Sequence, residues 1–212
     1  MISREDIISY CLSVLGEINP MIDGGSDTNN ALPVEDLISR FVETGLNESI
    51  GILPDKYLSY SEIPGDIVSL QDGSGYISLP NDFTERVCFK MRGWRRAVRR
   101  AIWEDSPLYA QQKSKATRGG INRPVCAIVR NGNGYVLEYY SLPAEERNPV
   151  VEVKMYVPRV KQSGDIADFD MDKGILPVVG YLICKHVCEA TGELEMSGYF
   201  ANEVMKQIEL LP

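Results

Sequence analysis

The chain has 212 residues, of which 44% are hydrophobic, and a formal net charge of −8. This length fits one domain with an insertion or two small domains, and the composition is typical of a soluble globular protein. No apolar run approaches the roughly 18 residues of a membrane helix, and the acidic N-terminus does not resemble a signal peptide. Five scattered cysteines without a CxxC pair indicate reduced thiols, so we expect a protein made inside the cell without a disulfide framework.

The charge is distributed unevenly along the chain. Between Arg86 and Arg130 there are twelve Lys/Arg residues and only two acids, Glu104 and Asp105, a net charge of +10 for this segment. The rest of the chain therefore carries −18. Such a separation can orient a protein toward an oppositely charged neighbour, whether another copy of itself or nucleic acid.

The first part of the chain has two helical patterns. Apolar residues recur at helical spacing over 3–18, with Ser3 as a plausible N-cap and Asp6 three residues later in a variant of the capping box. The Pro-, Gly- and Asn-rich residues 20–32 predict a loop. A second helix is predicted over 33–49, with Pro33 and two acids in its first turn.

The middle of the chain has strand patterns. β-branched and aromatic runs bounded by Gly, Pro and Asn predict five strands, over 75–80, 84–94, 124–131, 134–142 and 149–158. In the last run, alternation places Val151 and Val153 on one face and Tyr156 on the opposite, polar face. The NGNG sequence at 131–134 predicts a hairpin, and 106–116 a short helix with Ser106 as its N-cap.

From Gly174 onward the pattern is helical again, with helices predicted up to Gly192 and over 194–211. The sequence thus predicts an α+β protein, an α-helical bundle formed by N- and C-terminal helices with an inserted antiparallel β-domain. We assign 1–60 and 172–212 to the bundle and 75–158 to the β-domain with its basic hairpin. The polar stretches 20–32 and 55–74 are interpreted as arms that become ordered on assembly.

No motif predicts catalysis or a cofactor. Cys184 and Cys188 share a helix face, but His186, the only histidine, lies about 200° from each, so the three cannot converge on a metal. The Gly-rich loops do not match phosphate-binding motifs, and the acids at 165–174 lack the glycine and glutamate of a calcium loop. We therefore predict no enzyme activity, no metal and no cofactor.

The most unusual segment is the basic one, residues 93–119, in which two tryptophans stand among arginines and lysines. Tryptophan and arginine are enriched in protein–protein hot spots, which favours a subunit or partner interface. A solvated basic face, or phosphate contacts with tryptophan stacking on nucleic acid, are the alternatives. The candidate interface residues are Arg92, Trp94, Arg95, Arg96, Arg99, Arg100, Trp103, Tyr109, Lys113, Lys115 and Arg118.

Three short motifs within residues 75–158 resemble a known family. They are an LPxDFxR-like turn, a DSPEYxxQ-like helix start and a TRGxxxxPVxAxV-like strand. The matching residues are Leu79, Pro80, Asp82 and Phe83, then Asp105, Ser106, Pro107 and Tyr109, then Thr117, Arg118, Gly119, Pro124 and Val125. In these motifs the chain resembles the head–tail connector (adaptor or ring) proteins of short-tailed phages, especially the ring proteins of crAss-like phages. Arg86 departs from the spacing of the family's basic position.

The resemblance implies a structural virion protein of the phage neck, assembled in the host cytoplasm as a twelvefold ring. Its partners would be further copies of itself, the portal protein and further ring or tail proteins, with genomic DNA passing through the channel during ejection without sequence-specific binding. Because tight phosphate binding would stall DNA in a channel, we expect the basic hairpin to contact protein. The alternative is a module that binds nucleic acid or a packaging factor through 86–130.

Overall fold

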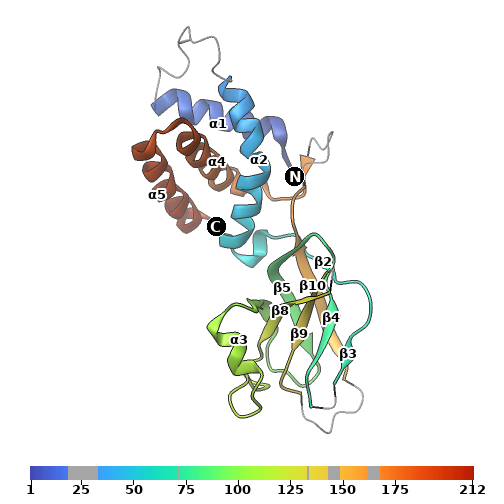
Figure 1. Ribbon diagram of the computed structural model, residues 1–212. Helices are drawn as coiled ribbons and strands as arrows, with labels where there is room; N and C mark the ends of the chain where they lie inside the picture. Colours follow the sequence, from blue (N-terminus) through green and yellow to red (C-terminus); the bar gives the residue numbers. More distant parts are fainter. Residues whose placement is uncertain (19–32, 71, 133, 143–148, 162–167) are drawn as a thin grey trace. The chain divides into compact units, whose positions relative to one another are not determined.

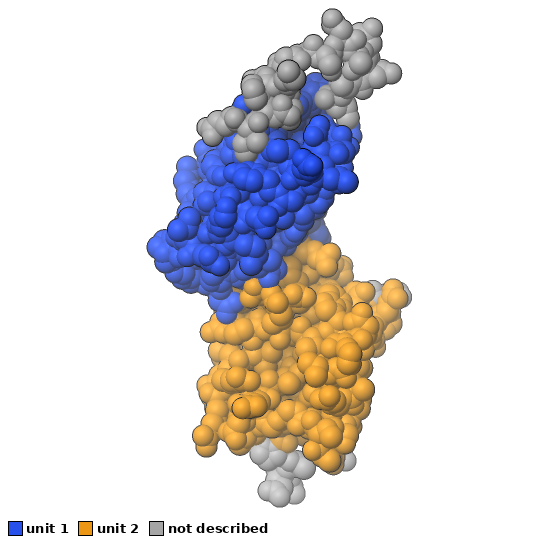
Figure 2. Space-filling model, turned by 90° about the vertical axis from the view of Figure 1, so that its left-hand side faces the viewer, with its two compact units in different colours: residues 1–59, 160–212 blue, residues 60–159 orange. Residues whose placement is uncertain are grey.

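The computed structural model describes residues 1–18, 33–70, 72–132, 134–142, 149–161 and 168–212; the side chains of 17, 18 and 168 are not described, and the predicted 20–32 loop lies outside these ranges. The chain forms two compact units (Figures 1 and 2). Unit 1 comprises Met1–Ser59 and Val160–Pro212, and unit 2 comprises Tyr60–Arg159. The predicted α+β class, with helices at both ends of the chain, is confirmed.

Unit 1 is a helical bundle with α4 at its centre. Its helices are α1 (Arg4–Ile18), α2 (Val34–Ile52), α4 (Leu176–Thr191) and α5 (Leu194–Leu210). Helix α4 packs against α1, α2 and α5 (Figure 1). Short 3-10 turns, η1 (Asp55–Tyr57) and η2 (Lys173–Ile175), follow α2 and precede α4, and β1 (Ile2–Ser3) pairs with β11 (Asp168–Phe169).

Local capping signals place the helix ends of unit 1. The Ser3 hydroxyl accepts from the Asp6 amide at 2.9 Å, and the Asp6 carboxylate accepts from the Ser3 amide at 3.2 Å, which confirms the predicted capping box. Helix α2 begins directly after Pro33 and ends three residues later than predicted, at Ile52. Gly192, at φ 85°, ends α4 in the left-handed conformation that favours glycine.

Unit 2 contains two sheets packed face to face. The first has the order β2 (Ser61–Glu62), β10 (Val151–Pro158), β5 (Phe83–Met91) and β6 (Val98–Arg100). The second has the order β3 (Val68–Ser69), β4 (Gly75–Ser78), β9 (Gly134–Tyr139), β8 (Cys126–Asn131) and β7 (Ile102–Trp103). All pairings are antiparallel except β7 with β8, so the second sheet is mixed. Side chains from both sheets form one core that includes Phe89, Tyr139 and Tyr156.

The edges of the two sheets are linked by continuous chain. On one side, β6 pairs with β5 and, directly after Ala101, β7 pairs with β8 of the other sheet. On the other side, β2 and β3 follow one another and belong to different sheets. The stretch 55–74, interpreted from the sequence as an arm, therefore supplies η1 and the edge strands β2 and β3. Residue 71 of this stretch is not described. These edge strands have only two residues each, and such short edge strands limit unwanted pairing with other chains.

The pairing of strand β10 with β5 contradicts the predicted position of Tyr156. Val151 pairs with Met91, but the next pair is Val153 with Lys90, so Glu152 is an extra residue in a β-bulge. Beyond the bulge the faces are exchanged, and Tyr156, opposite Val87, lies in the core at 6% exposure. The predicted polar position of Tyr156 is therefore wrong, because simple alternation does not anticipate a bulge.

The segment between β7 and β8 forms the short helix α3 (Pro107–Gln112). The Ser106 hydroxyl accepts from the Leu108 amide and Pro107 occupies the first turn, as the sequence predicts. Tyr109 of α3 reaches Glu138 on the outward side of β9, where Glu138 is opposite Tyr76 and Ala127. Helix α3 thereby covers part of the outward face of the second sheet.

Candidate protein interface

The basic hairpin consists of β5, β6 and the turn between them, residues 92–97. The Trp94 amide donates to the Met91 carbonyl at 3.0 Å, and Gly93 takes φ 91°, which favours glycine. The side chains of five arginines are exposed on this hairpin and its turn: Arg92, Arg95, Arg96, Arg99 and Arg100. The predicted hairpin arginines thus lie at the protein surface.

The arginines differ in how they are held. Arg100 is opposite Arg86 on β5 and forms an ion pair with Glu85, with 3.3 Å between Nε and Oε1. Within the described part of the chain, no ion pair or side-chain hydrogen bond involves Arg92, Arg95 or Arg96. The turn therefore presents three cationic side chains to solvent, where an anionic partner could bind them.

The two tryptophans do not lie at the surface with the arginines. Trp94 is 3% exposed and contacts Phe89 edge-on, with 6.0 Å between ring centroids. Trp103 is partly buried against Phe83 and Tyr135, and its Nε1 donates to Glu85 at 3.3 Å. The prediction that both rings contact a partner or stack on bases is therefore wrong for Trp94 and unsupported for Trp103, because burying these large apolar rings stabilises the core.

A second segment extends the exposed part of the hairpin. The Arg95 amide donates to the Ile121 carbonyl at 3.0 Å, which places the 120–123 turn beside the hairpin turn. Ile121 is 41% exposed, and Arg123 of the same turn is also exposed. We define the basic face as Arg92, Arg95, Arg96, Ile121 and Arg123. The sequence analysis did not select the last two, although the Gly-Gly before Ile121 indicates an exposed turn.

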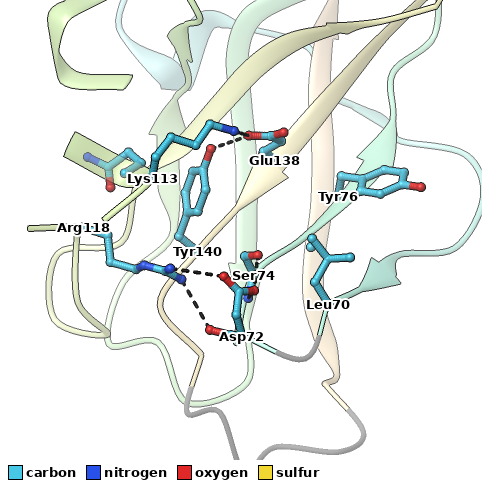
Figure 3. Close-up of a pocket in the computed structure, with 10 residues that line it drawn as sticks. Leu70, Asp72, Ser74, Tyr76, Lys113, Arg118, Glu138 and Tyr140 are labelled. Carbon is cyan, nitrogen blue, oxygen red and sulfur yellow. Dashed lines mark hydrogen bonds and ion pairs between the residues drawn. The ribbon is translucent and has the colours of Figure 1, made fainter. Parts of the chain in front are cut away.

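Glu138 on β9 accepts hydrogen bonds from three side chains, Tyr109, Lys113 and Tyr140. Figure 3 shows two of them, Lys113 and Tyr140. Tyr109 and Lys113 each lie 3.2 Å from Oε2, and the Tyr140 hydroxyl donates to the same oxygen. Burial lowers the pKa of Lys113, but hydrogen bonds with Tyr109 and Glu138 raise the pKa more. Burial, followed by the bond to Glu138, raises the pKa of Tyr140. Tyr109 and Lys113 therefore hold α3 on the sheet, which is a structural role that the sequence analysis did not assign.

Arg118 is also used internally. Its side chain is 10% exposed and its Nη2 forms an ion pair with Asp72 at 3.2 Å, while the guanidinium lies over the Tyr140 ring (Figure 3). Hydrogen bonds from Ser74 and, less strongly, from Arg118 lower the pKa of Asp72 to about 2. The charge of Arg118 is thus neutralised inside unit 2, and its contact with a partner protein stays a prediction. Lys115, in contrast, is exposed.

A pocket of about 210 Å³ lies between these two clusters. Its lining includes Asp72, Ser74, Lys113, Arg118, Glu138 and Tyr140. Figure 3 shows these polar groups turned toward one another, and each has an internal hydrogen-bond or ion-pair partner. The pocket is therefore explained by the attachment of α3 and of the 113–120 segment to the sheet.

The CKHVC sequence lies on α4 of unit 1. Cys184 and Cys188 are buried, whereas His186 lies between Glu48 (2.6 Å from Nε2) and Glu189 (3.1 Å from Nδ1) and stacks on Phe41. Among the residues that the structure describes, no group of three or more His, Cys, Asp or Glu could hold a metal ion. The histidine connects α4 to α2 through the Glu48 carboxylate and the Phe41 ring.

The comparisons with known proteins do not place the chain in a family. No protein-family model matches it, and no curated protein matches it. In the described ranges, no helix has the length and apolar character needed to span a membrane.

Proposed function

We propose that this protein is a structural subunit of the phage neck, in which copies form a ring that joins the portal to the tail and extends the DNA channel. The observation that carries the proposal is the charge of the two units. Unit 1 contains 7 Lys/Arg and 19 Asp/Glu residues, and unit 2 contains 15 and 11. Their net charges are therefore −12 and +4.

Opposite charges on two folded units suit repeated contact between copies. A subunit whose acidic unit meets the basic unit of the next copy forms a head-to-tail contact, and such contacts produce closed rings when the rotation between copies closes. The exposed arginines of the basic face provide the cationic side of this contact. Complementary charge also speeds the encounter of copies and disfavours wrong orientations.

The resemblance to phage connector proteins supports the proposal through structural positions in unit 2. Leu79 and Phe83 are buried, and the Asp82 carboxylate accepts from the Tyr156 hydroxyl at 3.0 Å, so this motif holds the turn between β4 and β5. Ser106 caps α3, and a side chain on Gly119 would overlap the Arg123 carbonyl. The residues in common are those that build the domain, and the twelvefold symmetry is taken from the resemblance.

Nucleic-acid binding is the competing function. Stacking of bases on aromatic rings contributes strongly to single-strand binding, and the burial of Trp94 removes one of the two rings proposed for it. The arginines of the basic face still suit phosphate contacts, so salt-dependent DNA binding is the measurement that separates the two functions.

The test is native mass spectrometry and negative-stain microscopy of the protein alone and mixed with its phage's portal protein. We expect rings, formed alone or on the portal. A dodecameric portal without this protein is the matched control for ring images. A chain that stays monomeric with portal and binds duplex DNA with a steep salt dependence would overturn the proposal and favour nucleic-acid binding.

A further inference from the structure

Helix α5 has an exposed apolar stripe. Leu194, Gly198, Ala201 and Met205 recur at intervals of four, three and four residues and therefore share one side of the helix. Leu194 is 71% exposed and Met205 is 59% exposed, while the core side of α5 contributes Phe200 and Val204. Helix α5 packs chiefly against α4 (Figure 1), so the stripe is left uncovered within unit 1.

Acidic side chains flank this stripe. Glu193 and Glu195 stand on either side of Leu194 in the sequence, and Glu209 lies near the other end; all three are exposed. The lysine of this helix, Lys206, forms an ion pair with Glu203. The free surface along the stripe is therefore apolar in the middle and negative at its margin. We define the acidic stripe as Glu193, Leu194, Glu195, Met205 and Glu209.

The basic face of unit 2 has the inverse arrangement. Ile121, 41% exposed, lies beside Arg95, and Arg92, Arg96 and Arg123 complete the face. An exposed isoleucine among arginines matches an exposed leucine among glutamates in both polarity and sign. Contact between them would bury both apolar side chains and place arginine next to carboxylate, the pairing that forms strong charge-assisted hydrogen bonds.

From this match we propose that the acidic stripe of one copy docks on the basic face of the next copy, with Leu194 against Ile121. The inference rests on the proposed ring function and names its subunit contact. A second copy is the partner because every copy carries one surface of each sign, so a head-to-tail contact uses both surfaces throughout a ring. Arginine is among the residues enriched in binding hot spots.

Crosslinking between engineered cysteines tests the contact directly. The five native cysteines are buried, so Ile121→Cys and Leu194→Cys introduce the exposed thiols. Mixing the two single variants under mild oxidation should give a 121–194 disulfide between different copies, identified by peptide mass spectrometry. Leu194→Cys alone should give little dimer, since a head-to-tail contact does not bring two copies of residue 194 together. Glu35→Cys, an exposed acid on α2, is the matched control partner for Ile121→Cys.

Charge reversal tests the role of the flanking residues. Arg95→Glu with Arg96→Glu should reduce the 121–194 crosslink at least about tenfold, because like charges facing each other at an interface are disfavoured. Adding Glu193→Lys and Glu195→Lys, so that both cysteine variants carry all four charge changes, should restore the crosslink. The charges of the two surfaces are then exchanged but still complementary. Thermal unfolding of each variant shows whether it remains folded, and the restored chain distinguishes loss of contact from loss of fold.

The two proposals fail in different ways. If the wild type forms rings but the mixture gives no 121–194 disulfide, or charge exchange restores nothing, the docking inference is overturned and ring formation stands. If the wild type forms no oligomer even with portal, the proposed function fails and this contact fails with it.

Discussion

The two units carry their charges differently. Unit 2 keeps several charges within its fold: Glu138 accepts from Lys113 and two tyrosines, and Arg118 is paired with Asp72. The arginines of its hairpin turn, Arg92, Arg95 and Arg96, are instead exposed and have no ion pair among the described residues. Unit 1 has an excess of twelve acids, and one of its carboxylates, Glu48, is held between α2 and α4 by His186 and Lys185.

This difference separates two uses of charge. A part-buried charge must be compensated locally because desolvation is unfavourable, so the clusters at Glu138, Arg118 and Glu48 serve the fold. Exposed charges without an ion pair among the described residues, such as those of Arg92, Arg95 and Arg96, contribute little to the fold of unit 2 and are available to partners. Mutations in the cores and clusters should therefore change stability, and mutations on the basic face should change association.

The largest expected effect comes from the core of each unit. Phe89→Ala removes a fully buried ring that stacks on Tyr139, and should lower the free energy of unfolding of unit 2 by about 3–5 kcal/mol. Both tryptophans lie in unit 2, and four of the five α-helices found in the described residues lie in unit 1. Tryptophan fluorescence therefore follows unit 2, and helical circular dichroism mainly follows unit 1. We expect the fluorescence midpoint in denaturant to fall further than the helical midpoint.

Phe200→Ala in α5 is the matched variant, since Phe200 is also fully buried. It should lower the helical midpoint and leave the fluorescence midpoint nearly unchanged. Equal shifts of both midpoints in both variants would show that the units unfold together, and the separation of the two units as independent folding bodies would then be wrong.

The second-largest change in stability is expected from a mutation in the Glu138 cluster. Glu138→Gln removes the charge that three donors share and should destabilise unit 2 by about 1–3 kcal/mol, because the donors from Tyr109, Lys113 and Tyr140 lose their common charged acceptor. Fluorescence-detected unfolding measures this loss of stability. The matched control is Glu152→Gln, which removes an exposed ion pair with Lys90 and should change stability by less than about 1 kcal/mol. Equal effects would contradict a special role for the cluster.

Lowering the pH should reduce the stability of unit 2, because the Asp72 carboxylate becomes protonated. The folded pKa, about 2, is below the ordinary value of 3.8, so the carboxylate contributes stability that is fully present above about pH 4 and is lost as the pH falls toward 2. With the side chain 41% exposed, solvent screening limits this contribution to about 1 kcal/mol. In Asp72→Asn this part of the pH dependence should disappear. An unchanged slope between pH 4 and 2 would show that Asp72 is not the responsible group.

Much of the fold could be predicted from local sequence signals. The capping box of Ser3 and Asp6, the Ser106–Pro107 helix start and the hairpin between β8 and β9 depend on residues within a few positions of one another. Such signals act before tertiary structure forms, and the sequence analysis identified them correctly. The bulge at Glu152 escaped it, since only pairing with β5 decides where the extra residue lies.

The candidate site was predicted less well for the same reason. The exposure of the hairpin arginines follows from their charge, but Arg118 is paired with a residue 46 positions away, and no local pattern indicates that pairing. Tryptophan was interpreted as an interface residue from its enrichment there, whereas Trp94 is buried in the aromatic core of unit 2 beside Phe89. The position of Ile121 beside the hairpin depends on the backbone hydrogen bond from the Arg95 amide to the Ile121 carbonyl, which joins turns 26 positions apart and which no local pattern indicates.

The smallest effect on stability is expected at the basic face. Arg95→Glu with Arg96→Glu should change the unfolding free energy of unit 2 by less than about 0.5 kcal/mol, because both side chains are exposed and have no ion pair within the described residues. Fluorescence-detected unfolding at low and high salt measures this change. A slight stabilisation at low salt would also fit, since the change relieves repulsion among neighbouring arginines, and it should fade as salt screens the charges. A loss of more than about 2 kcal/mol would contradict the distinction drawn between the units, for it would mean that the hairpin arginines serve the fold of unit 2 itself.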